Sequence, residues 1–139
     1  MLVLDTNHLR ELGYRSALGV RLRRRIEAAA EDVVFTIVSA EEMLKGRLAR
    51  TAAARDVGDQ VLSYERLAET ISFIADYTLL LWDAEAAARF RQFREQGVRI
   101  GAQDLKIACI TIEHDATLLT RNTVDFSKVP GLRFENWLD

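Results

Sequence analysis

Four acidic residues, far apart in the sequence, each stand where a short apolar run gives way to a turn or a helix: Asp5, Glu42, Asp104 and Asp125. In an open parallel sheet the carboxyl ends of the strands share one edge, and ligands bind in the crevice there. Acids that are distant in sequence can therefore meet at one hard cation, and carboxylates without His or Cys ligands suit Mg²⁺ or Mn²⁺. The pattern predicts metal-assisted phosphodiester chemistry.

Each acid also has a purely structural interpretation. Asp5 and Asp125 suit turns, and Asp104 suits the positive end of a helix dipole. Glu42 would close a capping box in which Ser39 is the N-cap, and its spacing alone does not separate capping from metal ligation. Like charges gathered at one edge raise one another's pKa, a cost normally retained only where a cation or a reaction needs it. The set as a whole therefore favours a functional site.

Other catalytic chemistries fit the sequence poorly. His8 and His114 are too few and wrongly spaced for a zinc site, and Cys109 has no partner cysteine. The sequence contains no phosphate-binding Gly-Lys-Ser/Thr loop, no dinucleotide fingerprint and no Gly-x-Ser-x-Gly nucleophile elbow. Trp82 and Trp137 are interpreted as core residues rather than as platforms for stacking bases.

The elements that must position the acids follow from the apolar periodicity. Strands are expected over residues 2–4, 33–37, 78–82, 116–120 and 132–135. Helices are expected over residues 18–29, after Ser39, and over 57–75, 83–96 and 105–112. Strands alternating with helices predict right-handed crossovers and a three-layer α/β domain, with a twisted parallel sheet flanked by helices. Residues 39–77 contain no strand, so we expect a helical hairpin to project beside the sheet. One domain is expected to span residues 1–139.

Composition limits the partners and the compartment. The chain has 139 residues, 49% of them hydrophobic, and a formal charge of −2, which argues against bulk electrostatic binding to nucleic acid. The basic run Arg21–Arg25 is either a solvated helix face or a set of phosphate contacts. No apolar run reaches the length of a membrane span, so no membrane association is expected. The single cysteine, Cys109, fits a buried thiol in a reducing cytoplasm.

Four sequence motifs carry a family resemblance. They are Leu-Asp-Thr-Asn at 4–7, Ser-x-x-Glu-Met-x-x-Gly at 39–46, Ile-Gly-x-x-Asp at 100–104, and Leu-Leu-Thr-Arg-Asn-x-x-Asp-Phe-x-x-Val-Pro-Gly-Leu at 118–132. In this order and at these separations they resemble PIN domains, and most of all the VapC-type toxins of toxin–antitoxin modules. The resemblance extends from Leu2 to about Leu138.

The resemblance implies a Mg²⁺- or Mn²⁺-dependent endoribonuclease with a PIN-like fold. Asp5, Glu42 and Asp104 match the three core acids, and Asp5 and Asp104 match the direct metal ligands. At the fourth position, Asn122 stands where some relatives have Asp, while Asp125 fills a following Asp-Phe position, so either can complete the site. The small polar residues that line such sites are matched by Thr6 and Thr120.

The resemblance also implies partners. These are an RNA substrate, a second copy of the chain in a homodimer, and a cognate VapB-like antitoxin that blocks the acidic groove. Lys45 and Arg47, one turn beyond Glu42, are candidates to position the RNA backbone. Two alternatives stay open, a PIN-like module that has lost catalysis and a nuclease that acts on DNA or structured RNA. A receiver-like site fits less well, because Asp5 is not part of an acidic pair and Val129 separates Lys128 from Pro130. A dehalogenase-like phosphatase site also fits less well, because the second Asp of that class is Asn7 here.

Overall fold

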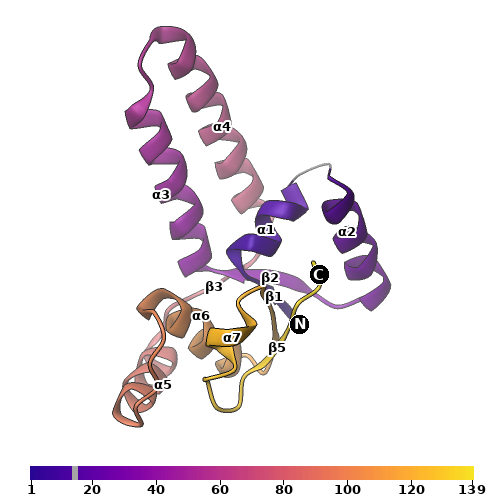
Figure 1. The fold of residues 1–139 in the computed structure, drawn as a ribbon, viewed down its shortest axis with the longest axis vertical. Helices are drawn as coiled ribbons and strands as arrows, with labels where there is room; N and C mark the ends of the chain where they lie inside the picture. Colours follow the sequence, from indigo (N-terminus) through magenta and orange to yellow (C-terminus); the bar gives the residue numbers. More distant parts are fainter. Residues whose placement is uncertain (14–15) are drawn as a thin grey trace.

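The computed structural model describes residues 1–13 and 16–139. Five parallel strands form one sheet in the order β3-β2-β1-β4-β5 (Figure 1). Their bounds are β1 Leu2–Leu4, β2 Val33–Thr36, β3 Leu79–Leu80, β4 Thr117–Leu119 and β5 Arg133–Glu135. β1 lies at the centre, with Val3 opposite Val34 of β2 on one side and Leu118 of β4 on the other. This arrangement confirms the predicted parallel α/β sheet.

The helices cover both faces of the sheet. They are α1 Thr6–Gly13, α2 Ala17–Ala29, α3 Ile37–Ala53, α4 Val57–Ala75, α5 Ala84–Glu95, α6 Ala102–Glu113 and α7 Thr123–Phe126. Because side chains alternate along a strand, the two faces of β1 enter different cores. Val3 packs with Phe93 and Leu105 of α5 and α6, whereas Leu4 packs with Leu9 and Leu22 of α1 and α2. The predicted three layers are therefore present.

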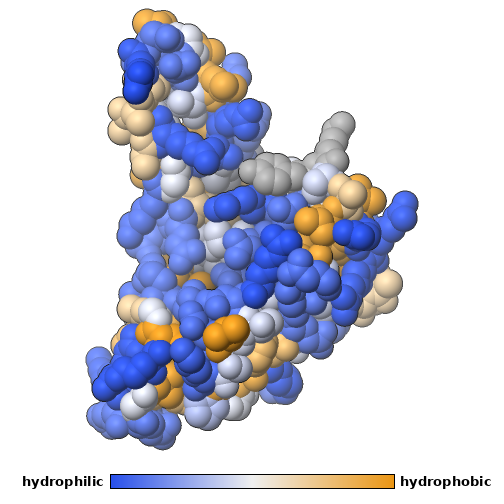
Figure 2. Space-filling view, viewed as in Figure 1, coloured by the Kyte–Doolittle hydropathy of each residue, from blue (hydrophilic) through white to orange (hydrophobic). Residues whose placement is uncertain are grey.

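The helical hairpin predicted for residues 39–77 is formed by α3 and α4, which extend together away from the sheet (Figure 1). The apolar stripe of α4, which predicts the helix, is left largely exposed. Val57 is 75% exposed, Tyr64 60% and Ile71 53%. Figure 2 shows hydrophobic residues gathered at the far end of this hairpin. The periodicity therefore identified the helix correctly. The stripe itself is not covered by the residues that the structure describes.

Several predicted boundaries are wrong. β2 ends at Thr36 and α3 begins at Ile37, whereas the helix was predicted to begin only after Ser39. The N-cap is Thr36, whose Oγ1 accepts a hydrogen bond from the Ser39 N–H at 3.1 Å, so the capping box with Ser39 as N-cap is wrong. The strand predicted over 78–82 contains only Leu79–Leu80, and the short helices α1 and α7 were not predicted.

Two further sequence predictions concern charge and membranes. Arg21, Arg23, Arg24 and Arg25 are all exposed on α2, as expected for a solvated helix face. Arg25 lies over the ring of Trp137, with its Cζ 4.4 Å from the ring centroid. No helix within residues 1–13 and 16–139 is long and apolar enough to cross a membrane.

Candidate active site

Asp5 is the buried centre of the site. It follows β1 directly, is 7% exposed, and its backbone N–H donates to the Leu119 carbonyl at 2.9 Å, which ties it to the end of β4. One carboxylate oxygen accepts from the Thr6 N–H and the other from the Thr120 hydroxyl, both at 2.8 Å. Burial raises the pKa of Asp5, and these two hydrogen bonds oppose the rise.

Glu42 reaches the same edge from the second turn of α3. Its Oε2 accepts a hydrogen bond from the Thr6 hydroxyl at 2.6 Å. Glu42 therefore does not cap its own helix, which was the main structural alternative. Thr6 joins the two acids, because its backbone N–H contacts Asp5 while its side chain contacts Glu42.

Asn122 links the remaining two acids. Its Nδ2 donates to Asp104 Oδ2 at 3.2 Å and to Asp125 Oδ2 at 3.0 Å. Its own backbone N–H donates to the Thr120 hydroxyl at 3.0 Å, and that hydroxyl in turn contacts Asp5. Asp104 belongs to the first turn of α6, and Asp125 to α7. One network of hydrogen bonds thus joins all four predicted acids. Thr120 and Asn122 connect Asp5 with Asp104 and Asp125, and Thr6 connects Asp5 with Glu42.

The effect of the other three carboxylates is seen in the pKa of Asp104. The pKa of Asp104 is raised to about 6, first by burial and then by the negative charges of Asp5, Glu42 and Asp125. Asp125 lies farther out, and its pKa is lowered by the Asn122 hydrogen bond and by Lys128, whose Nζ is 3.5 Å from Oδ1. The structure therefore brings together the acids that the sequence singled out and concentrates the cost of their repulsion on Asp104.

The donor set fits a hard cation in its chemistry. The side chains that meet here offer carboxylate and hydroxyl oxygens, which suit Mg²⁺ and Mn²⁺. Asn122 directs its Nδ2 to the acids, and its Oδ1 accepts the Asp125 N–H. A cation would also relieve the repulsion that raises the pKa of Asp104. As the side chains stand, no group of three or more His, Cys, Asp or Glu within the described ranges is arranged so that it could hold a metal ion. The fit is therefore one of chemistry and charge.

The two basic residues predicted to contact RNA lie in different surroundings. The Lys45 ammonium pairs with Glu41 at 3.7 Å on the exposed side of α3, and Glu41 also accepts from Gln103 of α6 at 2.8 Å. Arg47 instead donates from Nε to the Thr70 hydroxyl of α4 at 3.2 Å and lines a pocket between α1, α3 and α4.

That pocket also contains Arg10, Arg50 and Arg66, of which Arg10 and Arg66 were not singled out from the sequence. They come from three different helices. Arg47 and Arg50 could be placed on one face of α3 from their spacing, but no sequence signal brings α1 and α4 to that face.

Comparison with known proteins places the chain in a family. The family model of the PIN domain matches residues 2–132. The chain belongs to the PIN domain family. This PIN domain is 24% identical over 112 residues to Ribonuclease VapC1 of Haemophilus influenzae, covering 77% of this chain and 75% of that protein. Over 46 residues it is 41% identical to Ribonuclease VapC2 of Rickettsia felis, which covers 33% of this chain and 34% of that one.

Solved structures agree with this assignment. The PIN domain matches a crystal structure of FitAcB from Neisseria gonorrhoeae with a TM-score of 0.72 and 25% identity, over 99% of this chain and 98% of that one. It also matches VapBC2 from Rickettsia felis bound to a DNA fragment from its promoter, with a TM-score of 0.71 and 20% identity over 98% of both chains. The second likeness supports the fold alone.

Proposed function

We propose that this PIN domain is a Mg²⁺- or Mn²⁺-dependent endoribonuclease and the toxin of a toxin–antitoxin pair. The observation that carries the proposal is the convergence of Asp5, Glu42, Asp104 and Asp125, whose charges, together with burial, raise the pKa of Asp104 to about 6. Carboxylates held together against repulsion at a sheet edge are suited to a divalent cation and a phosphodiester substrate. The likeness to two proteins named as VapC ribonucleases supports the same reaction.

Each residue has a distinct role in this proposal. Asp5 and Asp104 would hold the ion directly, and Thr6, Thr120 and Asn122 would fix the orientation of the carboxylates. When bound, the ion supplies a Lewis acid for the phosphodiester and lowers the pKa of a water. Glu42 would orient that water, directly or through a second one, and Asp125 or Asn122 would complete the site.

The proposed partners follow from the relatives. An RNA strand is the substrate, a VapB-like antitoxin is the inhibitor, and a second copy of the chain forms a homodimer. FitAcB, at 25% identity, is among the similar structures and supports a partner of this kind. The cytoplasm is the proposed place of action, because the lone buried thiol of Cys109 suits a reducing compartment.

The experiment compares the wild-type chain with Asp5→Asn and Asp104→Asn on a pool of cellular RNA, with Mg²⁺, with Mn²⁺ and with EDTA. Asp32→Asn is the matched control, because Asp32 is an exposed acid outside the site. We expect metal-dependent cutting by the wild type and by Asp32→Asn, and at least a hundredfold loss in the other two variants.

Parallel reactions on single-stranded DNA and on folded RNA separate the alternatives. Cutting of DNA alone would replace the ribonuclease with a DNA nuclease. Absence of cutting on every substrate, with all four chains folded, would favour a binding module without catalysis. Equal cutting by all four chains would mean that the acids at this edge are not the active site.

A further inference from the structure

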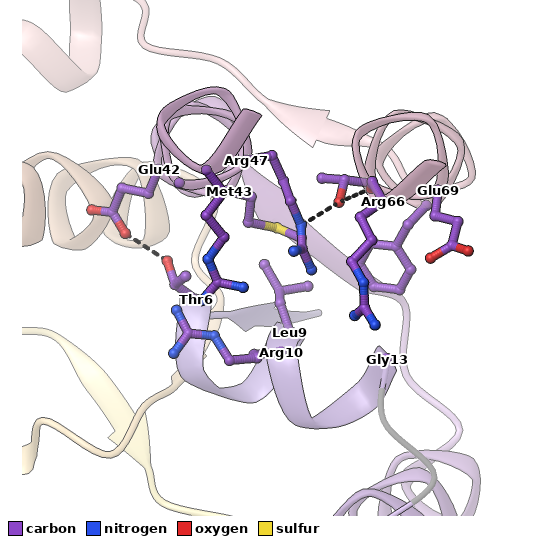
Figure 3. Close-up of a pocket in the computed structure, with 13 residues that line it drawn as sticks. Thr6, Leu9, Arg10, Gly13, Glu42, Met43, Arg47, Arg66 and Glu69 are labelled. Atoms are coloured by element: carbon purple, nitrogen blue, oxygen red, sulfur yellow. Dashed lines mark hydrogen bonds between the residues drawn. The ribbon is translucent and has the colours of Figure 1, made fainter. Parts of the chain in front are cut away.

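The pocket beside the acids is rich in arginine. It has a volume of about 470 Å³ and lies between α1, α3 and α4. Figure 3 shows the side chains of Arg47 and Arg66 extending from α3 and α4 into the space between these helices, while Arg10 of α1 lies below Thr6 at the side of the pocket. With Arg50 the pocket has four guanidinium groups against two carboxylates, those of Glu42 and Glu69. Its lining therefore carries a net positive charge although the whole chain is negative.

These guanidinium groups are not neutralised by the acids nearby. Among the residues that the structure describes, Arg10, Arg47, Arg50 and Arg66 make no ion pair with a carboxylate within 4.0 Å, and Arg47 contacts only the neutral Thr70 hydroxyl. An arginine fork pairs with the oxygens of a phosphate through two parallel hydrogen bonds. Four such groups around one space are therefore suited to a phosphate.

The inner wall of the pocket is apolar. Leu9, Met43 and Phe73 line it, and Leu9 is only 1% exposed. Gly46 lines the pocket without a side chain, and a Cβ placed there would meet nothing within 4 Å. The volume is within the range of pockets that hold small organic ligands. A charged rim with an apolar wall suits the phosphate and the ring of a nucleotide better than a bare anion.

The pocket is continuous with the acidic site. Thr6 and Glu42 line it, and the same two residues form the 2.6 Å hydrogen bond that holds Glu42 at the acidic edge. A strand whose reacting phosphate lies at the acids would therefore place a neighbouring nucleotide at the arginines. Only an unpaired strand can insert a base into such a pocket.

We infer that this pocket binds a nucleotide next to the scissile phosphate of single-stranded RNA. Arg47, Arg50 and Arg66 contact its phosphate, and its ring rests on the wall formed by Met43 and Phe73. The inference rests on the proposed ribonuclease function and adds to it the subsite that positions the strand.

The first test measures binding rather than cleavage. A fluorescent single-stranded RNA is titrated with the Asp5→Asn chain, without metal, over a range of salt concentrations. Arg50→Gln and Arg66→Gln are added singly, since neither arginine makes a side-chain hydrogen bond among the described residues. Each should weaken binding about tenfold and reduce the salt slope by about 0.7. Arg21→Gln and Arg24→Gln on α2 are the matched controls and should change affinity less than about twofold.

A second variant fills the pocket without changing its charge. Glu42, Met43, Gly46, Arg47 and Arg50 follow at the spacing of one helix face, so a side chain at position 46 enters the pocket. Gly46→Leu replaces a helical glycine with a strong helix former and so preserves the fold. We expect it to weaken binding of the single strand at an unchanged salt slope, and to affect a blunt RNA duplex much less. An equal effect on both would contradict insertion of a nucleotide.

The same pocket variants are then made in the chain that keeps Asp5, and RNA cleavage by each is measured. This second measurement separates the subsite from the ribonuclease function. If the pocket variants bind RNA as the parent does, the subsite is wrong, even where the wild type cuts RNA. If they bind RNA weakly and the wild type never cuts, the subsite stands and the ribonuclease is wrong. If they bind and cut RNA normally but no longer bind a cognate antitoxin, the pocket is a protein-binding site and the inference is overturned.

Discussion

Asp104 carries the electrostatic cost of the acidic site. Its pKa is raised to about 6, so the folded chain holds a proton there at a pH at which the unfolded chain, with an ordinary value near 3.8, has lost it. The metal-free fold therefore loses stability as the pH rises from about 4 to about 6, and the full cost is present above that window.

We predict that Asp104→Asn stabilises the metal-free protein at pH 7.5. After allowance for partial solvent screening, the gain should be about 1 to 2 kcal/mol. The gain should shrink toward pH 4, where Asp104 is already neutral. Mg²⁺ should raise the melting temperature of the wild type but not that of the variant, as measured by differential scanning fluorimetry. A variant that is less stable than the wild type at pH 7.5 would contradict the assignment of this cost to Asp104.

His8 makes stability depend on pH in the direction opposite to that of Asp104. It is fully buried and its Nε2 accepts the Trp137 N–H at 3.2 Å, while its Nδ1 has no partner among the described residues. Burial, with a smaller effect of the Arg121 charge, lowers its pKa from 6.5 to about 4. Between these values the unfolded chain binds more protons than the folded one, so the free energy of unfolding falls as the pH falls.

We predict that His8 alone removes about 3 kcal/mol of stability between pH 7 and pH 4. His8→Gln keeps an acceptor for the Trp137 N–H but does not titrate, so urea unfolding of this variant should depend less on pH over that range. A pH dependence as steep as that of the wild type would show that His8 is not the responsible group.

The residues of the site were predictable to different degrees. Asp5, Glu42 and Asp104 could be found because each follows a readable apolar run, and parallel strands bring such positions to one edge. The hydrogen bonds through Thr6 and Asn122 could not be foreseen, because they depend on side-chain rotamers set by packing. The arginine pocket could not be foreseen either, since it needs the relative placement of α1, α3 and α4.

The start of α3 fixes where Glu42 points. Because Thr36 is the N-cap, the helix begins at Ile37, and Glu42 faces Thr6 rather than its own first turn. Ser39 lies inside the helix with its hydroxyl buried and, within the described residues, unpartnered.

We predict opposite outcomes for two hydroxyl deletions on this helix. Thr36→Ala should lower the free energy of unfolding by about 1 kcal/mol, because the Ser39 N–H loses its acceptor. Ser39→Ala should be neutral or stabilising, because it removes a buried hydroxyl that makes no hydrogen bond. Thr36→Ser, which keeps the cap, is the control, and chemical denaturation measures all three. The ranking would be reversed if Ser39 capped the helix.

At the level of elements, periodicity identified the long helices, and β1, β2, β4 and β5 were close to their observed ranges. β3 failed because Leu81 and Trp82 continue the apolar run after the backbone has left the sheet. The apolar stripe of α4 predicts a helix from its spacing, but the spacing does not say which residues, if any, cover the stripe.

In the whole molecule, the C-terminal segment completes the core on the α1 and α2 face of the sheet. Leu138 is 5% exposed and packs in the cluster that contains Leu4, Leu9 and Leu22. Two contacts hold the chain on either side of Leu138. The Trp137 backbone N–H donates to His8, and Arg121 forms an ion pair with Asp139 at 3.0 Å.

We therefore predict that Leu138→Ala costs about 2 to 4 kcal/mol of stability. Val124→Ala is the control, because Val124 is 72% exposed and its loss should change stability by less than about 0.5 kcal/mol. Urea unfolding followed by tryptophan fluorescence measures both. A cost for Leu138→Ala as small as that of the control would mean that the segment is not part of the core.

The strand order has a consequence for the time at which the site appears during synthesis. β1 precedes the other strands in the sequence yet occupies the centre of the sheet, and the Asp5 carboxylate and the Thr120 hydroxyl that holds it are 115 positions apart. Asn122 and Asp125 come later still. A nascent chain therefore lacks its acidic cluster until the segment that carries Asn122 and Asp125 has left the ribosome. In the proposed ribonuclease, a polypeptide still in synthesis would therefore lack the carboxylates that are needed to cut the messenger from which it is made.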